Sequence, residues 1–289
     1  MYSARITQDN RALIVLLLDR SGSMKDSYGG EVQNPQVVVS KAHAVAEACN
    51  LLLMDIVARC RLDAHYRHYF DICVMGYSSG EVYSLLCDNR WFLSPTELVA
   101  SIKSTKSTVR NVLNANGSEV TLYNNIKTWI EPHSEGDTPI CAAFTKLYEL
   151  LCQWHNSRGE ANYFPPTIIN ITDGEISDQE YAKLKKLRDK IMTLGSKDGN
   201  PLLFNFHISS NKENSLFFPT SVDEIPDEAR NLYNLSSVLP PLFKSEIARL
   251  KCDTEIEAKD YRAFCYNSVL SDFMRAMYIG TATTQQINQ

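Results

Sequence analysis

The sequence predicts an α/β protein with a doubly wound, mainly parallel central sheet and helices on both faces. The first observation is an uninterrupted run of six aliphatic residues at 13–18, which is typical of a strand buried on both of its faces. The second is another apolar strand at 166–172. The third is the alternation of strand and helix patterns between 12 and 208, which favours parallel strands joined by helical crossovers.

The first half of the chain supplies one side of this sheet. A strand at 12–18 and a polar loop at 24–36 precede a long helix from about 37 to 61, whose apolar residues recur at helical spacing. A strand at 69–77 and a hairpin partner at 81–86 flank a Ser-Ser-Gly turn, which predicts one antiparallel edge strand. Pro95 after a serine indicates a short helix that ends near 101.

The second half continues the alternation and then departs from it. We expect a helix from 139 to about 154, a strand at 166–172, a helix at about 178–193 and a strand at 202–208. Residues 102–135 are polar with Asn-Gly between β-branched runs, so they form either a small hairpin or an insertion. Beyond 210 we expect a short helix from 226, a break at 239–241 and a final amphipathic helix at 259–277.

Length and composition favour a single folded domain over residues 1–289. The chain is 44% hydrophobic and 22% charged, and 289 residues can bury a sizeable core. Within it we expect a core at about 10–210, a possible insertion at 102–135, a helical C-terminal part at 211–280 and a disordered tail at 281–289.

Charge and cysteine usage restrict the surroundings in which the protein works. The net charge of −5 argues against a nucleic-acid partner, and no apolar stretch approaches the ~20 residues of a membrane span. The N-terminus lacks the regions of a signal peptide, and the eight cysteines contain no Cys-x-x-Cys pair. We therefore expect a cytoplasmic protein whose thiols are reduced and mostly buried.

A candidate metal site follows the first strand directly. Asp19, Ser21 and Ser23 stand at alternate positions, and Gly22 lets the loop turn tightly. Open α/β sheets bind ligands at the carboxyl ends of their strands. A carboxylate and two hydroxyls are hard oxygen donors, which suit Mg²⁺ or Mn²⁺. A helix cap explains them poorly, because the long helix begins more than ten residues later.

Two further segments carry oxygen ligands to the same predicted edge. Thr138 lies in Gly-Asp-Thr-Pro-Ile before a helix, where its hydroxyl would otherwise serve as a cap. Asp173 opens a Thr-Asp-Gly turn after the strand at 166–172, where it would otherwise be an ordinary turn residue. Placed beside Asp19, both residues become candidate metal ligands.

Together the three segments resemble the von Willebrand factor A family and its metal-ion-dependent adhesion site. The family pattern is Asp-x-Ser-x-Ser, a threonine from a middle loop and an aspartate in a Thr-Asp-Gly turn. Asp19, Ser21, Ser23, Thr138 and Asp173 match it in order. The resemblance covers about 10–210 and implies a Rossmann-like fold and a metal-binding, non-enzymatic module that captures a Glu or Asp of a partner protein.

The resemblance also implies partners of a particular kind. Asp-Arg-Ser-Gly-Ser-Met and Thr-Asp-Gly-Glu are similar to segments of intracellular bacterial TerY-like and MoxR-associated members of the family. Those members work with AAA+ ATPases or with kinase and phosphatase pairs. The segments 102–135 and beyond 210 match no motif of the family.

A phosphotransfer enzyme is the main alternative. Haloacid-dehalogenase-like hydrolases also place an aspartate after the first strand and use Mg²⁺, but they need a second acid two residues later, where this chain has Ser21. The sequence also shows no phosphate-binding lysine after a later strand. Asp137 and Glu175, beside the proposed ligands, either tune the charge of the site or are simply solvated.

Two cysteine–histidine groups are weaker candidates. Cys60, His65 and His68 lack a suitably spaced fourth ligand for zinc. A nucleophilic cysteine at 141 needs a base that only folding could bring to it, and the candidates are His133 and His155.

Overall fold

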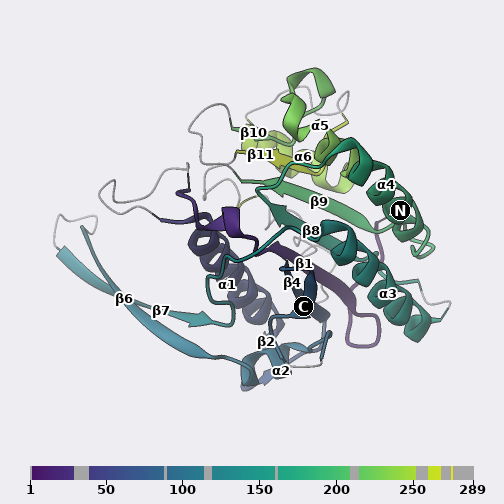
Figure 1. Cartoon of the computed structure of the whole chain (residues 1–289). Coiled ribbons are helices and arrows are strands. Elements are labelled where there is room, and N and C mark those ends of the chain that lie inside the picture. The colour runs from purple at the N-terminus through teal and green to yellow at the C-terminus, as the bar shows by residue number, and fades with distance from the viewer. Residues whose placement is uncertain are drawn as a thin grey trace.

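The computed structural model describes residues 2–28, 39–87, 90–113, 119–159, 162–208, 215–251, 260–267 and 275, without the side chains of 108–124 and 250. Seven strands form the central sheet in the order β10-β11-β9-β8-β1-β4-β5 (Figure 1). Neighbouring strands are parallel from β11 to β4 and antiparallel at the two edges. The strands are β1 (Ala12–Asp19), β4 (Phe70–Ser78), β5 (Glu81–Ser84), β8 (Thr167–Thr172), β9 (Leu202–His207), β10 (Leu216–Phe217) and β11 (Phe264–Tyr266).

Helices cover both faces of the sheet. One face packs against α1 (Lys41–Cys60), α2 (Pro95–Ala100) and α6 (Pro241–Lys251). The other packs against α3 (Ile140–Arg158), α4 (Asp178–Met192) and α5 (Asp227–Leu235). Side chains alternate along β1, so Ile14 and Leu16 enter the α1 core while Leu13 and Val15 enter the α3 core. This explains why the strand is apolar from Ala12 to Leu18 and confirms the expected α/β fold class.

A long hairpin stands apart from the sheet. β6 (Ser104–Leu113) and β7 (Glu119–Thr128) pair antiparallel, and the hairpin extends away from the body of the molecule in Figure 1. At its base, Asn50 of α1 fixes the following segment, because its side-chain oxygen accepts bonds from the N–H groups of Trp129 and Ile130 at 2.9 and 3.0 Å. Of the two expectations for 102–135, the hairpin is therefore confirmed.

The remaining elements are short. A second two-stranded sheet pairs β2 (Arg61–Leu62) with β3 (His65–Tyr66). The 3-10 helices are η1 (Gly22–Lys25), directly after β1, and η2 (Val222–Glu224), before α5.

Three expectations for the C-terminal part and the edges need correction. The sheet has two antiparallel edge strands, because β10 adds one beside β11. The helix expected at 259–277 is wrong for 260–267, where β11 forms and the side chains of Phe264, Cys265 and Tyr266 are all buried. An additional helix, α6, begins at the expected break, since Pro241 suits a first helical position. Residues 281–289 lie outside the described part.

The sheet topology creates a ligand position beside β1. β1 pairs with β4 on one side and with β8 on the other, so the chain crosses over in opposite directions from this strand. Such a switch point opens a crevice at the carboxyl ends of the strands. Asp19 ends β1, and Asp173 directly follows β8.

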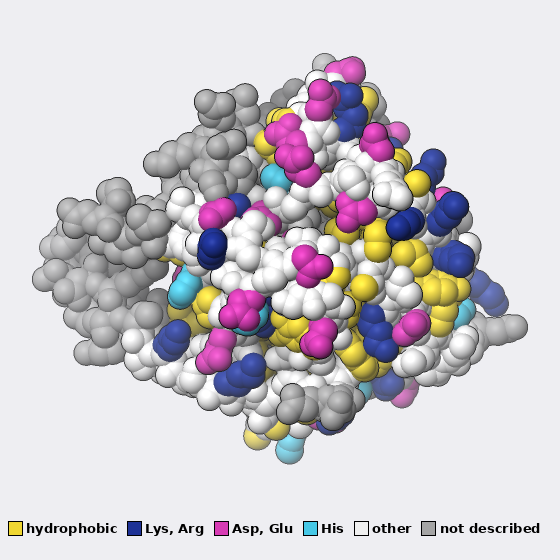
Figure 2. Space-filling view, viewed as in Figure 1, with side chains coloured by type: hydrophobic (Ala, Val, Ile, Leu, Met, Phe, Trp, Pro, Cys, Tyr) yellow, Lys and Arg dark blue, Asp and Glu magenta, His cyan; other side chains and the backbone are white. Residues whose placement is uncertain are grey.

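Acidic side chains gather on one part of the surface. Figure 2 shows Asp and Glu side chains gathered over α5, whose first turn carries Asp227 and Glu228. Among the described helices, none is long and apolar enough to cross a membrane. Among the described cysteines, Cys49, Cys60 and Cys73 are free and buried.

Candidate metal site at the carboxyl edge of the sheet

Three loops are joined at the carboxyl edge by backbone hydrogen bonds. The Gly22 N–H donates to the Gly136 carbonyl at 2.8 Å, and the Glu135 N–H donates to the Arg20 carbonyl at 2.9 Å. The Ser79 N–H donates to the Asp137 carbonyl at 3.3 Å. These bonds hold the segment before α3 against the ends of β1 and β4, which places Thr138 at the site.

Asp19 is a buried carboxylate with both oxygens bonded. Its side chain accepts the Ser21 N–H at Oδ1 (2.9 Å) and the Thr172 hydroxyl at Oδ2 (2.6 Å). Burial raises the pKa of Asp19, the hydrogen bonds from Ser21 and Thr172 oppose this rise, and the charge of Asp173 adds to it. The carboxylate is thus held in one orientation at the end of β1.

Asp173 is linked to the serines of the first loop. The Ser23 hydroxyl donates to Oδ1 of Asp173 at 2.8 Å, and the Ser21 and Ser23 hydroxyl oxygens are 3.3 Å apart. The ends of β1 and β8 therefore share one continuous group of polar side chains, as the sequence predicts.

The methyl group of Thr138 lies beside Gly174, near the same group. A Cβ placed on Gly174 would lie 3.6 Å from Cγ2 of Thr138 and 3.8 Å from Oδ2 of Asp19. The capping alternative for Thr138 receives no support, since α3 begins after Pro139 without a side-chain cap. The structure thus brings all five predicted residues to one place.

Three residues at this edge were missed by the sequence reasoning. Nζ of Lys41 lies 2.8 Å from Oδ2 of Asp173, and both side chains are buried. Thr172 bonds Asp19 and also accepts the Gly174 N–H at 3.0 Å. A lysine in the first turn of a helix opposes the helix dipole, which signals an acidic partner for Lys41 without identifying it.

His207 is the third of these residues and ends β9, beside Thr172. Its ring stacks on Tyr266 at a centroid distance of 4.9 Å. Burial lowers the pKa of His207 to about 4, so the ring is neutral near pH 7. Within the described part of the chain, its Nδ1 has no hydrogen-bond partner.

The donor set fits a hard divalent cation. Two carboxylates and three hydroxyls offer only oxygen, the ligand type that Mg²⁺ and Mn²⁺ take. The described residues contain no cluster of three or more His, Cys, Asp or Glu side chains able to hold a metal. A cation at this edge would therefore depend on hydroxyls and water besides Asp19 and Asp173.

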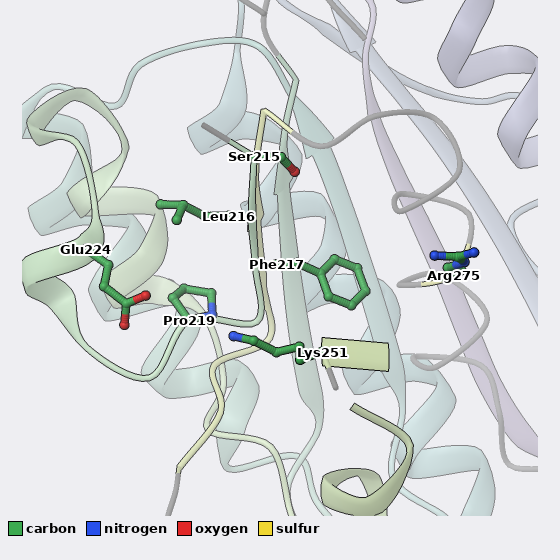
Figure 3. A pocket seen from close by; sticks show the side chains of 7 residues that line it. All are labelled: Ser215, Leu216, Phe217, Pro219, Glu224, Lys251 and Arg275. Carbon is green, nitrogen blue, oxygen red and sulfur yellow. The ribbon is translucent and has the colours of Figure 1, made fainter. Parts of the chain in front are cut away.

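The space beside Asp19 is small. A hollow of about 10 Å³, close to the least volume that can hold one water molecule, lies between β1 and α1 against Asp19, and none of the other four proposed ligands lines it. A larger cavity of about 280 Å³ lies elsewhere, at the β10 edge. Figure 3 shows Glu224, Pro219 and Lys251 close together in this cavity, with Arg275 further along. The larger cavity includes none of the five proposed ligands.

The weaker sequence candidates form other contacts. Nε2 of His68 lies 2.7 Å from Oδ1 of Asp71, and burial raises the pKa of Cys60 to about 12. Nδ1 of His155 lies 2.5 Å from the Tyr163 hydroxyl. These contacts favour structural roles. Asp137 and Glu175 are both exposed, which favours the alternative that they are solvated.

Comparisons with known proteins add little. No protein-family model and no curated protein matches the sequence. The PilB minor pilin from Streptococcus sanguinis is 10% identical, with a TM-score of 0.46, over 96% of this chain and 61% of that one. Proximal thread matrix protein 1 from the mussel byssus is 11% identical, with a TM-score of 0.44, over 96% and 48%. The vWF domain of the type V pili tip protein Mfa5 from Porphyromonas gingivalis is 11% identical, with a TM-score of 0.32, over 57% and 38%.

This chain spans less than two thirds of the length of each of these proteins. Similarities this low carry no argument about function.

Proposed function

We propose that this chain is a metal-dependent protein–protein interaction module and not an enzyme. Asp19, Ser21, Ser23, Thr138 and Asp173 would hold Mg²⁺ or Mn²⁺, directly or through water. The cation would offer an open coordination position to a Glu or Asp of a partner protein. The observation that carries the proposal is the assembly of these five oxygen-bearing side chains, from three separate loops, at the switch point of the sheet.

The proposed ligands lie at the ends of strands, next to loop residues that are exposed. A partner side chain could reach such an edge without entering a deep pocket. By the family resemblance, an AAA+ ATPase or a kinase and phosphatase pair in the bacterial cytoplasm is the proposed class of partner.

A phosphotransfer enzyme is the second candidate, and Lys41 is the observation that favours it. No lysine that could bind a phosphoryl group is evident from the sequence alone. In the structure, the ammonium of Lys41 lies 2.8 Å from Asp173. The required acid or base is still missing, because Ser21 occupies its position. We therefore rank this candidate below the interaction module.

The test of the leading proposal is titration of the full chain with Mn²⁺ by calorimetry. Asp19→Ala should abolish the binding heat, because it removes the carboxylate that ends β1. Asp189→Ala is the matched control, since it removes an exposed carboxylate of α4. Binding that persists unchanged in Asp19→Ala would overturn the assignment of the site.

Partner capture is tested separately. Proteins retained by the immobilised chain with Mg²⁺ should be lost in EDTA and with the Ser21→Ala/Ser23→Ala double variant, but kept by Asp189→Ala. Retention of the same proteins in all of these conditions would place the interaction elsewhere on the molecule.

A further inference from the structure

Lys41 and Asp173 form a buried ion pair inside the proposed metal site. The two side chains are 8% and 1% exposed, and Nζ lies 2.8 Å from Oδ2. Burial of an ammonium is costly unless an anion compensates it. The position in the first turn of α1 adds to the cost, because the N-terminal end of a helix carries partial positive charge.

The backbone holds Lys41 in this costly position. The Ser40 hydroxyl caps α1 by accepting the His43 N–H at 3.2 Å, and the Lys41 N–H donates to the Asp26 carbonyl at 3.0 Å. These bonds tie the start of α1 to the loop that carries the two serines. These backbone bonds between the loop and the helix direct the ammonium of Lys41 toward Asp173.

The ammonium changes the charge of the site. Two carboxylates and a divalent cation cancel, so a site built from Asp19 and Asp173 alone would be neutral when loaded. With Lys41 the loaded site carries one excess positive charge, and without a cation it carries one negative charge. Only the loaded site then attracts an anionic oxygen.

We propose that Lys41 determines the specificity of this site, by weakening its hold on the cation and making the loaded site selective for a carboxylate. This inference rests on the proposed function and deepens it. Its consequence is a pair of opposite effects. Removal of the positive charge at 41 strengthens cation binding and weakens carboxylate binding, each by about tenfold, as expected for one unit charge a few ångströms away in a partly screened site.

The test uses the full chain, with Mn²⁺ as the cation and glutarate as the carboxylate probe. Calorimetry gives Mn²⁺ affinity, and the Mn²⁺-induced broadening of glutarate proton signals gives carboxylate affinity. Lys41→Gln removes the charge and keeps an N–H donor for Asp173. Lys41→Met removes both and gives a second measurement if one variant folds poorly, which circular dichroism would show.

Two controls separate charge from other effects. Lys41→Arg keeps the positive charge, and Lys25→Met removes a positive charge from an exposed lysine of the neighbouring η1. Lys25→Met should leave the two affinities within about twofold of the wild type, and Lys41→Arg should shift them less than Lys41→Gln does, because it keeps the charge. Glutaramide, which has the size of glutarate without its charge, should show no broadening beyond that of free solution.

The outcomes distinguish this inference from the proposed function. Failure of the wild type and of all Lys41 variants to bind Mn²⁺ would overturn both the inference and the proposed function. If the wild type binds Mn²⁺ and glutarate, and Lys41→Gln and Lys41→Met bind both with the same affinities, the inference alone is overturned. Weaker Mn²⁺ binding in both variants would also overturn it, because the lysine would then be supporting Asp173 as a ligand.

Discussion

The hydroxyl of Thr172 donates to Oδ2 of Asp19 at 2.6 Å, and so joins the ends of two adjacent parallel strands. Thr172 is the last residue of β8 and is fully buried. Its oxygen also accepts the Gly174 N–H at 3.0 Å, which shapes the turn after Asp173. One side chain therefore orients a proposed ligand on β1 and the loop that carries another.

Thr172→Val should weaken Mn²⁺ binding by about tenfold or more, because groups that orient metal ligands typically have effects of that size. The substitution keeps the branched shape and removes the donor to Asp19. The measurement is calorimetric titration with Mn²⁺. Thr167→Val, at the other end of the same strand and equally buried, is the control and should bind as the wild type does. Equal affinities in the two variants would show that Thr172 does not position Asp19.

Gly136→Ala should disturb the loop that carries Thr138. A Cβ at 136 would lie 2.0 Å from Oγ of Ser79 and 2.9 Å from its Cα, and the residue has a φ of +71°. We expect a loss of about 1–3 kcal/mol in the free energy of unfolding, and weaker Mn²⁺ binding. Denaturant titration measures the first effect and calorimetry the second.

Gly80→Ala separates backbone strain from collision in this experiment. Gly80 has a similar φ of +77°, but a Cβ there would meet no atom within 4 Å. The Gly80→Ala variant should therefore be destabilised less than Gly136→Ala, and it should retain the Mn²⁺ affinity of the wild type. Equal behaviour of the two variants would mean that the contact with Ser79 is unimportant.

A phosphatase assay should be blank. With Mg²⁺ and p-nitrophenyl phosphate, we expect no turnover above buffer, because Ser21 cannot act as the general acid or base that the alternative mechanism needs. The measurement compares the wild type with Asp19→Asn. Turnover that disappears in Asp19→Asn would favour the enzyme over the interaction module.

The sequence was sufficient to predict the centre of the fold. β1 is apolar from Ala12 to Leu18 and β8 carries three isoleucines, which is typical of strands covered on both faces. Because Asp19 and Asp173 stand at the ends of these strands, the topology alone predicts that they meet. Thr138 is predicted by the family resemblance, because its position before Pro139 alone indicates a helix cap.

The C-terminal strands and Lys41 could not be predicted in the same way. β11 has three residues and β10 has two, which is too short for a periodic pattern, and their pairing depends on β9. Lys41 reaches Asp173 across a distance in sequence that no local pattern spans. Long-range contacts of this kind require the tertiary structure.

A separate ionic cluster lies at the start of β4, around Asp71. Its carboxylate accepts Nε1–H of Trp154 at 2.8 Å and pairs with His68 at 2.7 Å, Arg158 at 3.2 Å and Arg11 at 3.5 Å. Burial acts to raise the pKa of Asp71, but the hydrogen bonds from His68 and Trp154 and the neighbouring positive charges outweigh it, so the pKa is lowered from 3.8.

This lowered pKa predicts how stability depends on pH. The folded protein binds the Asp71 proton less tightly than the unfolded chain, so the stabilisation is present above about pH 4 and is lost as pH falls through the folded pKa. Asp71→Asn should cost about 3 kcal/mol near pH 7, since it leaves the half-buried Arg158 without its anion, and should flatten the decline below pH 4. Urea titrations from pH 7 to pH 3 measure both effects.

The control is Asp189→Asn, on the exposed face of α4, which should follow the wild-type curve. If the stability of Asp71→Asn declines with falling pH as steeply as that of the wild type, other carboxylates control the acid sensitivity.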